Sequence, residues 1–370
     1  MLTIKDIAKQ ANVSEGTVDR VIHNRGGVSK KTEEKILKIL QDNNFKLNPI
    51  ASALALRKKY VIATLIPKFD RENVFWESPY MGIMKALTEV ESYGIQIQNH
   101  SFDQFDAATY LSGFDQLFQA RPDVVIIVPM FINETKKIAK RLDGAGIPYM
   151  FLNIDLEGLG NISFIGQDSY KGGYVAGKLM CLSLKEGDEC VTVQTRSNIS
   201  NYHAIYKRME GFNDYLESTG GNKIRNLDLK VDNLNDQETV KANLEAFLEN
   251  NGNIRGIYVP SSRSSVIADC LDRAFHKKVK IIGFDTTPQN VSCMEMDQIQ
   301  FLISQKSFNQ GYEAVRMMSD YLIQKKTPLK RNYSPIQIII KENLAFNNRN
   351  KMSYQRENPK NGKVGVGDRS

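Results

Sequence analysis

Residues 3–40 carry the pattern of three short helices, which constrains the fold more than any other feature of the chain. Thr3 and Asp6 fit a capping box at the start of the first helix. Ser14 is placed to begin a second helix after a tight turn, and Ser29 to begin a third. The predicted inner faces of the three helices are Ile4, Ile7, Ala8 and Ala11; Thr17, Val18, Val21 and Ile22; and Ile36, Leu37, Ile39 and Leu40. Helices this short are unstable alone, so we expect them to pack together as one small domain.

Two helices joined by a tight turn are the arrangement that places the second helix in the major groove of DNA. That second helix would offer Glu15, Gly16, Asp19 and Arg20 to the groove. Gly16 has no side chain, which limits direct base readout at this position. Asp19 would repel phosphate unless it accepts a hydrogen bond from Arg20 or from a cytosine amino group, and both alternatives stay open. The alternative for the whole segment is a generic three-helix bundle.

The sequence pattern of residues 48–57 predicts one more helix. Asn48 is a helix N-cap and Pro49 a first-turn proline. Three alanines are small enough for a second copy of the chain to pack closely: Ala51, Ala53 and Ala55. Leu54 is an apolar side chain with no obvious core to enter.

The stretch from Thr3 to Leu56 resembles the lactose-repressor family of bacterial transcription regulators. The matching motif covers residues 4–21, 28–32 and 48–55, and the chain up to about residue 345 is more loosely similar to the family's sugar-binding-protein-like core. The resemblance implies a DNA-binding head at 1–47 and a hinge helix with linker at 48–59, with Leu54 pushed into a minor-groove step of the operator. The implied DNA contacts are Thr3, Ser14, Glu15, Gly16, Thr17, Arg20, Asn24, Ser29, Thr32, Asn48, Ala51 and Leu54.

The formal charge of +7 is distributed unevenly along the chain. Residues 1–59 hold 12 Lys or Arg and 6 Asp or Glu, and residues 346–370 hold 6 and 2, so the part between them is slightly acidic. A basic head on a mildly acidic body suits a phosphate-binding module attached to a ligand domain, although lysines are commonly just solvated. The tail at 346–370 has no apolar period, so we expect it to be disordered.

The 4 cysteines form no C-x-x-C pair and the 4 histidines show no metal-ligand spacing, so we expect no metal, no disulfide and no cofactor. The sequence shows neither an apolar signal segment nor a run of about 18 apolar residues, which favours a cytoplasmic protein. A sugar-binding protein without DNA function would need an export signal and would not carry residues 1–56. The usual dinucleotide, phosphate-loop, serine-hydrolase and zinc-protease motifs are missing, so we expect no enzyme.

Between residues 60 and 345, short apolar runs alternate with helical patterns, which predicts an α/β fold with parallel sheets covered on both faces. The expected strands are 61–66, 124–128, 149–152, 164–165, 191–193, 256–259, 280–283 and 301–303. We therefore expect two Rossmann-like lobes side by side. The resemblance implies the type I periplasmic-binding-protein fold, in which the chain crosses between the lobes three times. The predicted lobes are 60–162 plus 290–326, and 163–289 plus 327–345.

Polar and aromatic side chains follow several predicted strands, at the strand ends where open parallel sheets bind ligands. The candidates are Phe75, Trp76, Asp168, Arg208, Ser261, Asp285 and Gln305. Carboxylates and an Arg fork suit ligand hydroxyls, and aromatic faces suit the apolar side of a sugar ring. The structural alternatives are a helix cap for Asp168 and an Asx turn for Asp285. Phe75 and Trp76 could be core residues, Gln305 could satisfy backbone groups, and Arg208 could be a surface charge. The resemblance implies effector contacts for Asp168, Arg208, Asp285 and Gln305.

Two departures from the family pattern leave the effector open. Met130, Phe131 and Ile132 stand where sugar-binding relatives usually place an acidic residue, and Ser261-Ser262 stands where many have Asn-Asp. A monosaccharide or sugar acid is the first expectation, and a nucleobase or nucleoside is the alternative. The sequence thus predicts a homodimeric repressor of carbohydrate genes that binds double-stranded operator DNA under control of a small effector.

Overall fold

The computed structural model describes residues 3–22, 26–43, 59–70, 73–195, 203–218, 224–231, 234 and 236–347. The chain forms two compact units, residues 1–58 (the head) and 59–370 (the core). Predictions for Asn24, Asn48, Ala51, Leu54 and the tail from 348 onward lie outside the described residues. No helix in the described ranges is long and apolar enough to cross a membrane.

The head consists of the three predicted helices: α1 (Ile4–Ala11), α2 (Glu15–Ile22) and α3 (Lys30–Asp42). The capping box of Thr3 and Asp6 is confirmed, and Ser29 caps α3 by accepting a hydrogen bond from the backbone N–H of Thr32. Asn12 adopts a left-handed conformation (φ 58°) and ends α1, which reverses the chain toward α2.

Six buried side chains close the small core of the head: Ile7, Ala8, Ala11, Val18, Val21 and Ile36. Lys35 on α3 donates a hydrogen bond from Nζ to the backbone oxygen of Ala11 (2.8 Å), which ties α3 to the end of α1. The prediction that Leu37 belongs to the apolar side of α3 is wrong. Its side chain is 49% exposed, because successive residues of a helix point about 100° apart and the face of α3 that packs on the core is the one with Ile36, Ile39 and Leu40.

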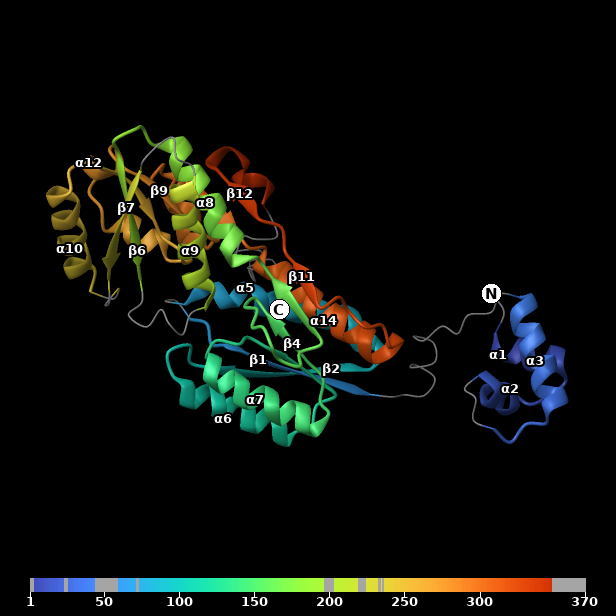
Figure 1. The fold of residues 1–370 in the computed structure, drawn as a ribbon. Coiled ribbons are helices and arrows are strands. Elements are labelled where there is room, and N and C mark those ends of the chain that lie inside the picture. Colours follow the sequence, from blue (N-terminus) through green and yellow to red (C-terminus); the bar gives the residue numbers. More distant parts are fainter. Residues whose placement is uncertain are drawn as a thin grey trace, which may run out of the picture. The chain divides into compact units, whose positions relative to one another are not determined.

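The first sheet of the core has the strand order β11-β5-β4-β3-β1-β2, and all its neighbours are parallel. Its strands are β1 (Tyr60–Pro67), β2 (Ile95–Phe102), β3 (Val124–Ile127), β4 (Tyr149–Leu152), β5 (Ser163–Gly166) and β11 (Arg331–Tyr333). Four helices cover this sheet: α5 (Glu77–Val90) and α14 (Ser307–Gln324) on one face, and α6 (Ala107–Gln119) and α7 (Ile132–Ala145) on the other (Figure 1).

The second sheet has the order β12-β10-β9-β8-β6-β7, with only β12 antiparallel to its neighbour. Its strands are β6 (Glu189–Gln194), β7 (Arg225–Lys230), β8 (Ile254–Tyr258), β9 (Lys280–Phe284), β10 (Phe301–Ser304) and β12 (Gln337–Ile339). One face packs on α8 (Ser169–Ser183) and α9 (His203–Ser218). The other packs on α10 (Gln237–Asn250), α11 (Ser264–Asp269) and α13 (Pro288–Glu295), with α12 (Arg273–His276) nearby (Figure 1). The predicted α/β fold with two parallel-sheet lobes is confirmed.

Strand pairing shows that the predicted boundaries between the lobes are wrong, because they assign two strands to the wrong sheet. β5 was expected to begin the second lobe, yet it pairs with β4 and β11 in the first sheet. β10 was expected in the first lobe, yet it pairs with β9 and β12 in the second. The chain therefore crosses between β5 and α8, between β10 and α14, and between β11 and β12. The first lobe comprises 60–166 and 307–333, and the second 169–304 and 337–346.

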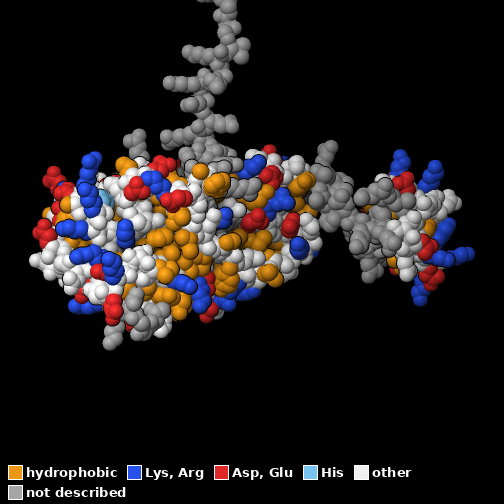
Figure 2. Space-filling view, turned by 90° about the horizontal axis from the view of Figure 1, so that it is seen from above, with side chains coloured by type: hydrophobic (Ala, Val, Ile, Leu, Met, Phe, Trp, Pro, Cys, Tyr) orange, Lys and Arg blue, Asp and Glu red, His pale blue; other side chains and the backbone are white. Residues whose placement is uncertain are grey.

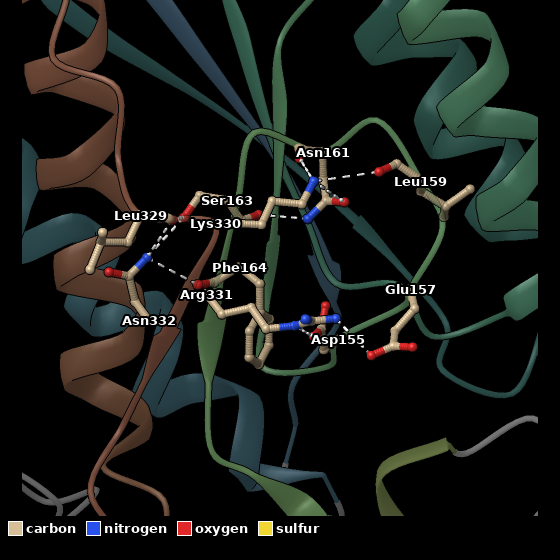
Figure 3. Close-up of polar contacts among 10 residues, drawn as sticks. All are labelled: Asp155, Glu157, Leu159, Asn161, Ser163, Phe164, Leu329, Lys330, Arg331 and Asn332. Atoms are coloured by element: carbon tan, nitrogen blue, oxygen red, sulfur yellow. Dashed lines mark hydrogen bonds and ion pairs between the residues drawn. The ribbon is translucent and has the colours of Figure 1, made fainter.

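The last segment of the first lobe, β11, is fixed to the loop between β4 and β5 (Figure 3). Arg331 donates to Asp155 (2.6 Å) and Glu157 (2.8 Å), while the neighbouring Lys330 donates to the backbone oxygen of Asn161. These contacts hold β11 at the edge of the first sheet. The chain that leaves β11 for the second lobe thus starts from a fixed position.

Candidate functional site

A cavity of about 60 Å³ lies where the two lobes meet, and we call it the inner cavity. Six of the seven predicted effector residues line it: Phe75, Trp76, Arg208, Ser261, Asp285 and Gln305. Phe75 and Trp76 come from the first lobe, in the short 3-10 helix η1 (Val74–Trp76) that follows β1. The others come from α9, from the ends of β8 and β9, and from the crossing after β10. The lining therefore includes side chains of both lobes.

A chain of hydrogen bonds connects the lobes beside this cavity. The side-chain amide of Gln305 donates to both carboxylate oxygens of Asp285, at 3.1 and 2.8 Å. Asn153, at the end of β4 in the first lobe, donates to the side-chain oxygens of Gln305 (3.3 Å) and Gln310 (2.9 Å). All four side chains are buried. A ligand that displaces or reorients Gln305 therefore acts on both lobes at once.

Arg208 is the buried cation of the site, with 4% of its surface exposed. Its Nη1 donates to the backbone oxygen of Pro260 (3.0 Å), and the guanidinium lies over the Phe284 ring at 3.9 Å. Burial lowers the pKa of Arg208, and the charge of Asp285 partly offsets this. The buried Nε has no hydrogen-bond partner, which is a donor that a ligand can satisfy.

A close helix crossing positions Arg208. A Cβ added at Gly173 on α8 would lie 1.9 Å from the backbone oxygen of Arg208 on α9. The reciprocal Gly211 on α9 would place a Cβ 2.0 Å from the backbone oxygen of Tyr170 on α8. Only glycine lets the two backbones approach this closely, so Gly173 and Gly211 have a packing role next to the site.

Asp285 ends β9 in a left-handed conformation (φ 66°) and is 5% exposed. Burial raises the pKa of its carboxyl to about 6, while Arg208 and the Gln305 hydrogen bonds act in the opposite direction. Asn290, fully buried on α13, donates to the backbone oxygens of Phe284 and Asp285 (both 2.9 Å) and of Ser262 (3.0 Å). This amide joins the turn after β9 to the loop after β8 and thereby fixes the carboxylate.

The aromatic wall and the serine also take defined positions. Phe75 and Trp76 meet edge to face, with ring centroids 4.9 Å apart, and Trp76 belongs to the core of the first lobe as well. The Ser261 hydroxyl pairs with that of Thr195 (3.0 Å) and accepts from the backbone N–H of Arg263 (3.3 Å). Ser261 thus stabilises the loop after β8 and also lines the inner cavity.

Asp168 lies outside the inner cavity, and its contact with the effector stays a prediction. Its carboxylate accepts a hydrogen bond from the backbone N–H of Lys171 (2.9 Å) and caps α8, as the alternative interpretation of Asp168 as a helix cap predicted. Asp168 lines an adjoining cavity of about 570 Å³, which shares Ile154 and Ala204 with the inner cavity, and does not line the inner cavity itself.

The polar residues of the inner cavity that escaped prediction are Asn73, Gln104 and Asn153. Asn153 directly follows β4, so the strand-end rule that found Asp285 would also have found it. Gln104 follows β2, whose polar sequence hid the strand. Among the described residues, no three His, Cys, Asp or Glu side chains group as a metal site.

Eight of the twelve predicted DNA contacts lie in the described part of the head. Thr3, Ser14 and Ser29 lie at the N-termini of the three helices, and all three are exposed. The hydroxyl of Ser14 contacts that of Thr17 (2.9 Å), and the hydroxyl of Ser29 contacts that of Thr32 (2.8 Å). Exposed hydroxyls at helix N-termini are suited to phosphate oxygens.

On α2, the helix expected to read the groove, Glu15, Gly16 and Arg20 are exposed and Asp19 is partly exposed. A Cβ added at Gly16 would meet only the Ser14 hydroxyl, at 3.9 Å, so packing within the head does not require glycine there. Lys and Arg side chains project from the head among acidic ones (Figure 2). That these residues contact DNA stays a prediction.

Two family models match the chain. The model of bacterial regulatory proteins of the lacI family matches residues 3–48, and that of the periplasmic binding protein domain matches residues 62–326.

Curated relatives match along nearly the full length. The ribose operon repressor of Halalkalibacterium halodurans is 24% identical over 347 residues, covering 92% of this chain and 97% of the relative. Catabolite control protein A of Priestia megaterium is 25% identical over 325 residues, covering 87% and 92%.

Among solved structures, a putative LacI transcriptional regulator from Bacteroides fragilis aligns with a TM-score of 0.70 and 25% identity, covering 78% of this chain and 99% of that one. The helix-turn-helix head, the two-lobed core with its cleft and these matches agree: the chain belongs, through its core, to the periplasmic binding protein domain family and carries in its head the helix-turn-helix domain of bacterial regulatory proteins of the lacI family.

Proposed function

We propose that this protein is a sugar-responsive transcriptional repressor, in which a small carbohydrate bound in the cleft controls the affinity of the head for operator DNA. The observation that carries the proposal is that one chain contains both a three-helix head and a core whose interlobe cavity is lined by the buried Arg208, Asp285 and Gln305. Relatives named as a ribose operon repressor and a catabolite control protein support the same assignment. Operator binding implies that the protein acts in the cytoplasm.

The chemistry of the cavity favours a polyhydroxylated ligand. Asp285 offers acceptors, Arg208 offers an unpartnered Nε–H donor, and Asn153 and Gln305 offer amides that can both donate and accept. Trp76 and Phe75 supply apolar surface for the face of a sugar ring. No described group in this arrangement stands out as a general acid distinct from a general base, so we infer binding rather than turnover.

The hydrogen bonds from Asp285 through Gln305 to Asn153 suggest how binding changes the angle between the lobes. A ligand that binds Asp285 competes with Gln305, which is also held from the first lobe. The free energy of such coupling between two sites is typically about 1–3 kcal/mol. We infer that this change reaches the segment 48–59 between head and core, and that Leu54 in it enters the minor groove.

We also propose a homodimer, because a palindromic operator calls for two heads. Apolar side chains gather in a band on one face of the core, which is the kind of surface that a second copy buries (Figure 2).

The direct test combines DNA and ligand binding in the same preparation. Fluorescence anisotropy with DNA from the upstream region of the protein's own gene should give saturable, sequence-selective binding. A fragment that begins at residue 59 should lose DNA binding and keep sugar-induced thermal stabilisation, since the head and core are separate compact units. Loss of both properties in the fragment would argue against this modular arrangement.

A further inference from the structure

A second cavity, of about 340 Å³, adjoins the inner cavity, and we call it the mouth cavity. The two cavities share the lining residues Asn73, Phe75, Ser262 and Arg263. A ligand whose ring occupies the inner cavity therefore has room to extend one substituent past Arg263. The inner cavity alone is small for a monosaccharide, so both spaces belong to one ligand site.

The described side chains that line the mouth cavity are neutral with one exception. Among its described lining residues there is no Asp or Glu, and Arg263 carries the charge. Gln237 and Gln289, which lie in the first turns of α10 and α13, also line it. Both helix starts are capped, by Asp236 on α10 and by Thr287 on α13. The carboxylate of Asp236 offsets the dipole of α10, whereas the partial positive charge at the start of α13 adds to the charge of Arg263.

In the inner cavity, too, the described lining has more positive than negative side chains. Its described charged residues are Arg208, Arg263 and Asp285, so two guanidinium groups face one carboxylate. Both oxygens of that carboxylate already accept hydrogen bonds from Gln305. The 4% exposed Arg208 retains an Nε–H without a partner. A cation removed from water is costly unless an anion or acceptor satisfies it, and the single carboxylate can offset the charge of only one of the two guanidinium groups.

Arg263 is positioned at the junction by its backbone and by the opposite lobe. It precedes α11, its backbone N–H donates to Ser261 (3.3 Å), and its guanidinium lies 5.8 Å from the ring centroid of Phe105 in the first lobe. Its side chain is only partly buried, so it can reorient toward a ligand without unfolding the loop.

From these observations we infer that the effector is an anionic sugar, one that carries a carboxylate or a phosphate, and that Arg263 binds this anionic group between the inner and mouth cavities. The inference deepens the proposed function, on which it rests, by naming the chemical class of its ligand. It also gives a role in specificity to Arg263, which directly follows Ser261-Ser262, the pair that differs from the usual Asn-Asp of the family.

The test uses the full chain and matched pairs of probes that differ in one group. The pairs are D-glucuronate with D-glucose, D-galacturonate with D-galactose, D-glucose 6-phosphate with D-glucose, and D-ribose 5-phosphate with D-ribose. Calorimetric titration should show at least one anionic probe binding about tenfold or more tightly than its neutral partner, as expected for a charge-assisted contact. The pair that responds distinguishes a carboxylate from a phosphate.

Variants of Arg263 connect the preference to this side chain. Arg263→Gln should remove the preference for the anion, and Arg263→Lys should restore part of it. The matched control is Arg273→Gln, at an exposed arginine of α12 that lines neither cavity, and it should keep the full preference. Thermal unfolding of each variant verifies that the fold is retained.

Three results would overturn the inference: neutral sugars that bind as tightly as their acids and phosphates, a preference that survives Arg263→Gln, or no binding of any anionic probe. In the first case, a neutral sugar that also changes operator affinity would leave the proposed function standing. Loss of operator binding itself, measured separately, is what would remove the proposed function.

Discussion

Gln305 donates its side-chain amide to both carboxylate oxygens of Asp285, so the acid of the cleft is hydrogen-bonded before any ligand arrives. Because Gln305 also accepts a hydrogen bond from Asn153 of the first lobe, a ligand that displaces Gln305 from Asp285 also changes a contact between the lobes. An interaction of this kind lets ligand binding exchange one set of hydrogen bonds for another, rather than simply filling a space.

Arg208 should be needed for the effector response through its shape as well as its charge. Arg208→Lys keeps the charge but loses the planar fork that contacts Pro260 and covers Phe284, so we expect effector affinity to fall by about tenfold or more. Arg208→Ala should also destabilise the fold, by about 2–4 kcal/mol, since it leaves a void in a buried position. Calorimetric titration and urea unfolding measure the two effects. Wild-type effector affinity in Arg208→Lys would remove this residue from the site.

Asp285 should make the ligand-free protein more stable as pH falls from 7 toward 4. Its folded-state pKa of about 6 lies above the unfolded value of 3.8, so the folded state binds the extra proton between these values. Unfolding free energy from this group therefore decreases as pH rises through this window, by about 3 kcal/mol in total. Asp285→Asn should abolish the dependence and be the more stable protein at pH 7.

The measurement for Asp285 is the difference in unfolding free energy between wild type and Asp285→Asn across pH 4–7. Subtraction is needed because burial lowers the pKa of His100 and of His203, which contributes pH dependence of the opposite sign. A difference that stays constant over this range would contradict the assigned environment of Asp285.

Gly173→Ala should impair both the packing of the second lobe and the site. The added methyl group would meet the backbone of Arg208 at 1.9 Å, so α8 and α9 must move apart. We expect a loss of about 1–3 kcal/mol in unfolding free energy and a weaker effector response, because Arg208 moves with α9. Gly252→Ala is the matched control, since a Cβ there meets nothing within 4 Å. Equal stability of the two variants would contradict the close crossing.

Gly16→Ala should separate stability from DNA binding. A Cβ at this position has space, and alanine favours a helix, so the head should become more stable by about 0.5–1 kcal/mol. Operator affinity should nevertheless fall, because the methyl group stands on the exposed start of the predicted recognition helix. Gly144→Ala on α7, where an added Cβ meets nothing within 4 Å, should leave operator affinity unchanged. Unaltered DNA binding in Gly16→Ala would place the groove contact elsewhere.

Local signals in the sequence were enough to predict much of the fold. The caps of α1 and α3 depend on residues three positions apart, Thr3 with Asp6 and Ser29 with Thr32, and both were readable. Strands buried on both faces, such as β3 and β4, appear as continuous apolar runs. The edge strands β2 and β7 were missed because their outer positions are exposed and their sequences are polar.

The lobe boundaries and one site residue were not predictable from local signals. Pairing of β11 with β5 joins segments more than 160 residues apart, and no short pattern encodes such a partner. Asp168 and Asp285 both follow a strand and look alike in the sequence. Only the three-dimensional arrangement shows that the first caps a helix and the second lines the cavity.

The central claim is that the small-molecule site in the core governs the hold of the head on DNA. The most direct measurement is the operator affinity of the full chain at fixed salt, with and without the sugar that stabilises it most, in wild type and Arg208→Lys. Our account predicts that the sugar shifts wild-type affinity by about fivefold or more and that the shift is lost in the variant. A wild-type affinity for operator DNA that is the same with and without a saturating sugar would contradict it.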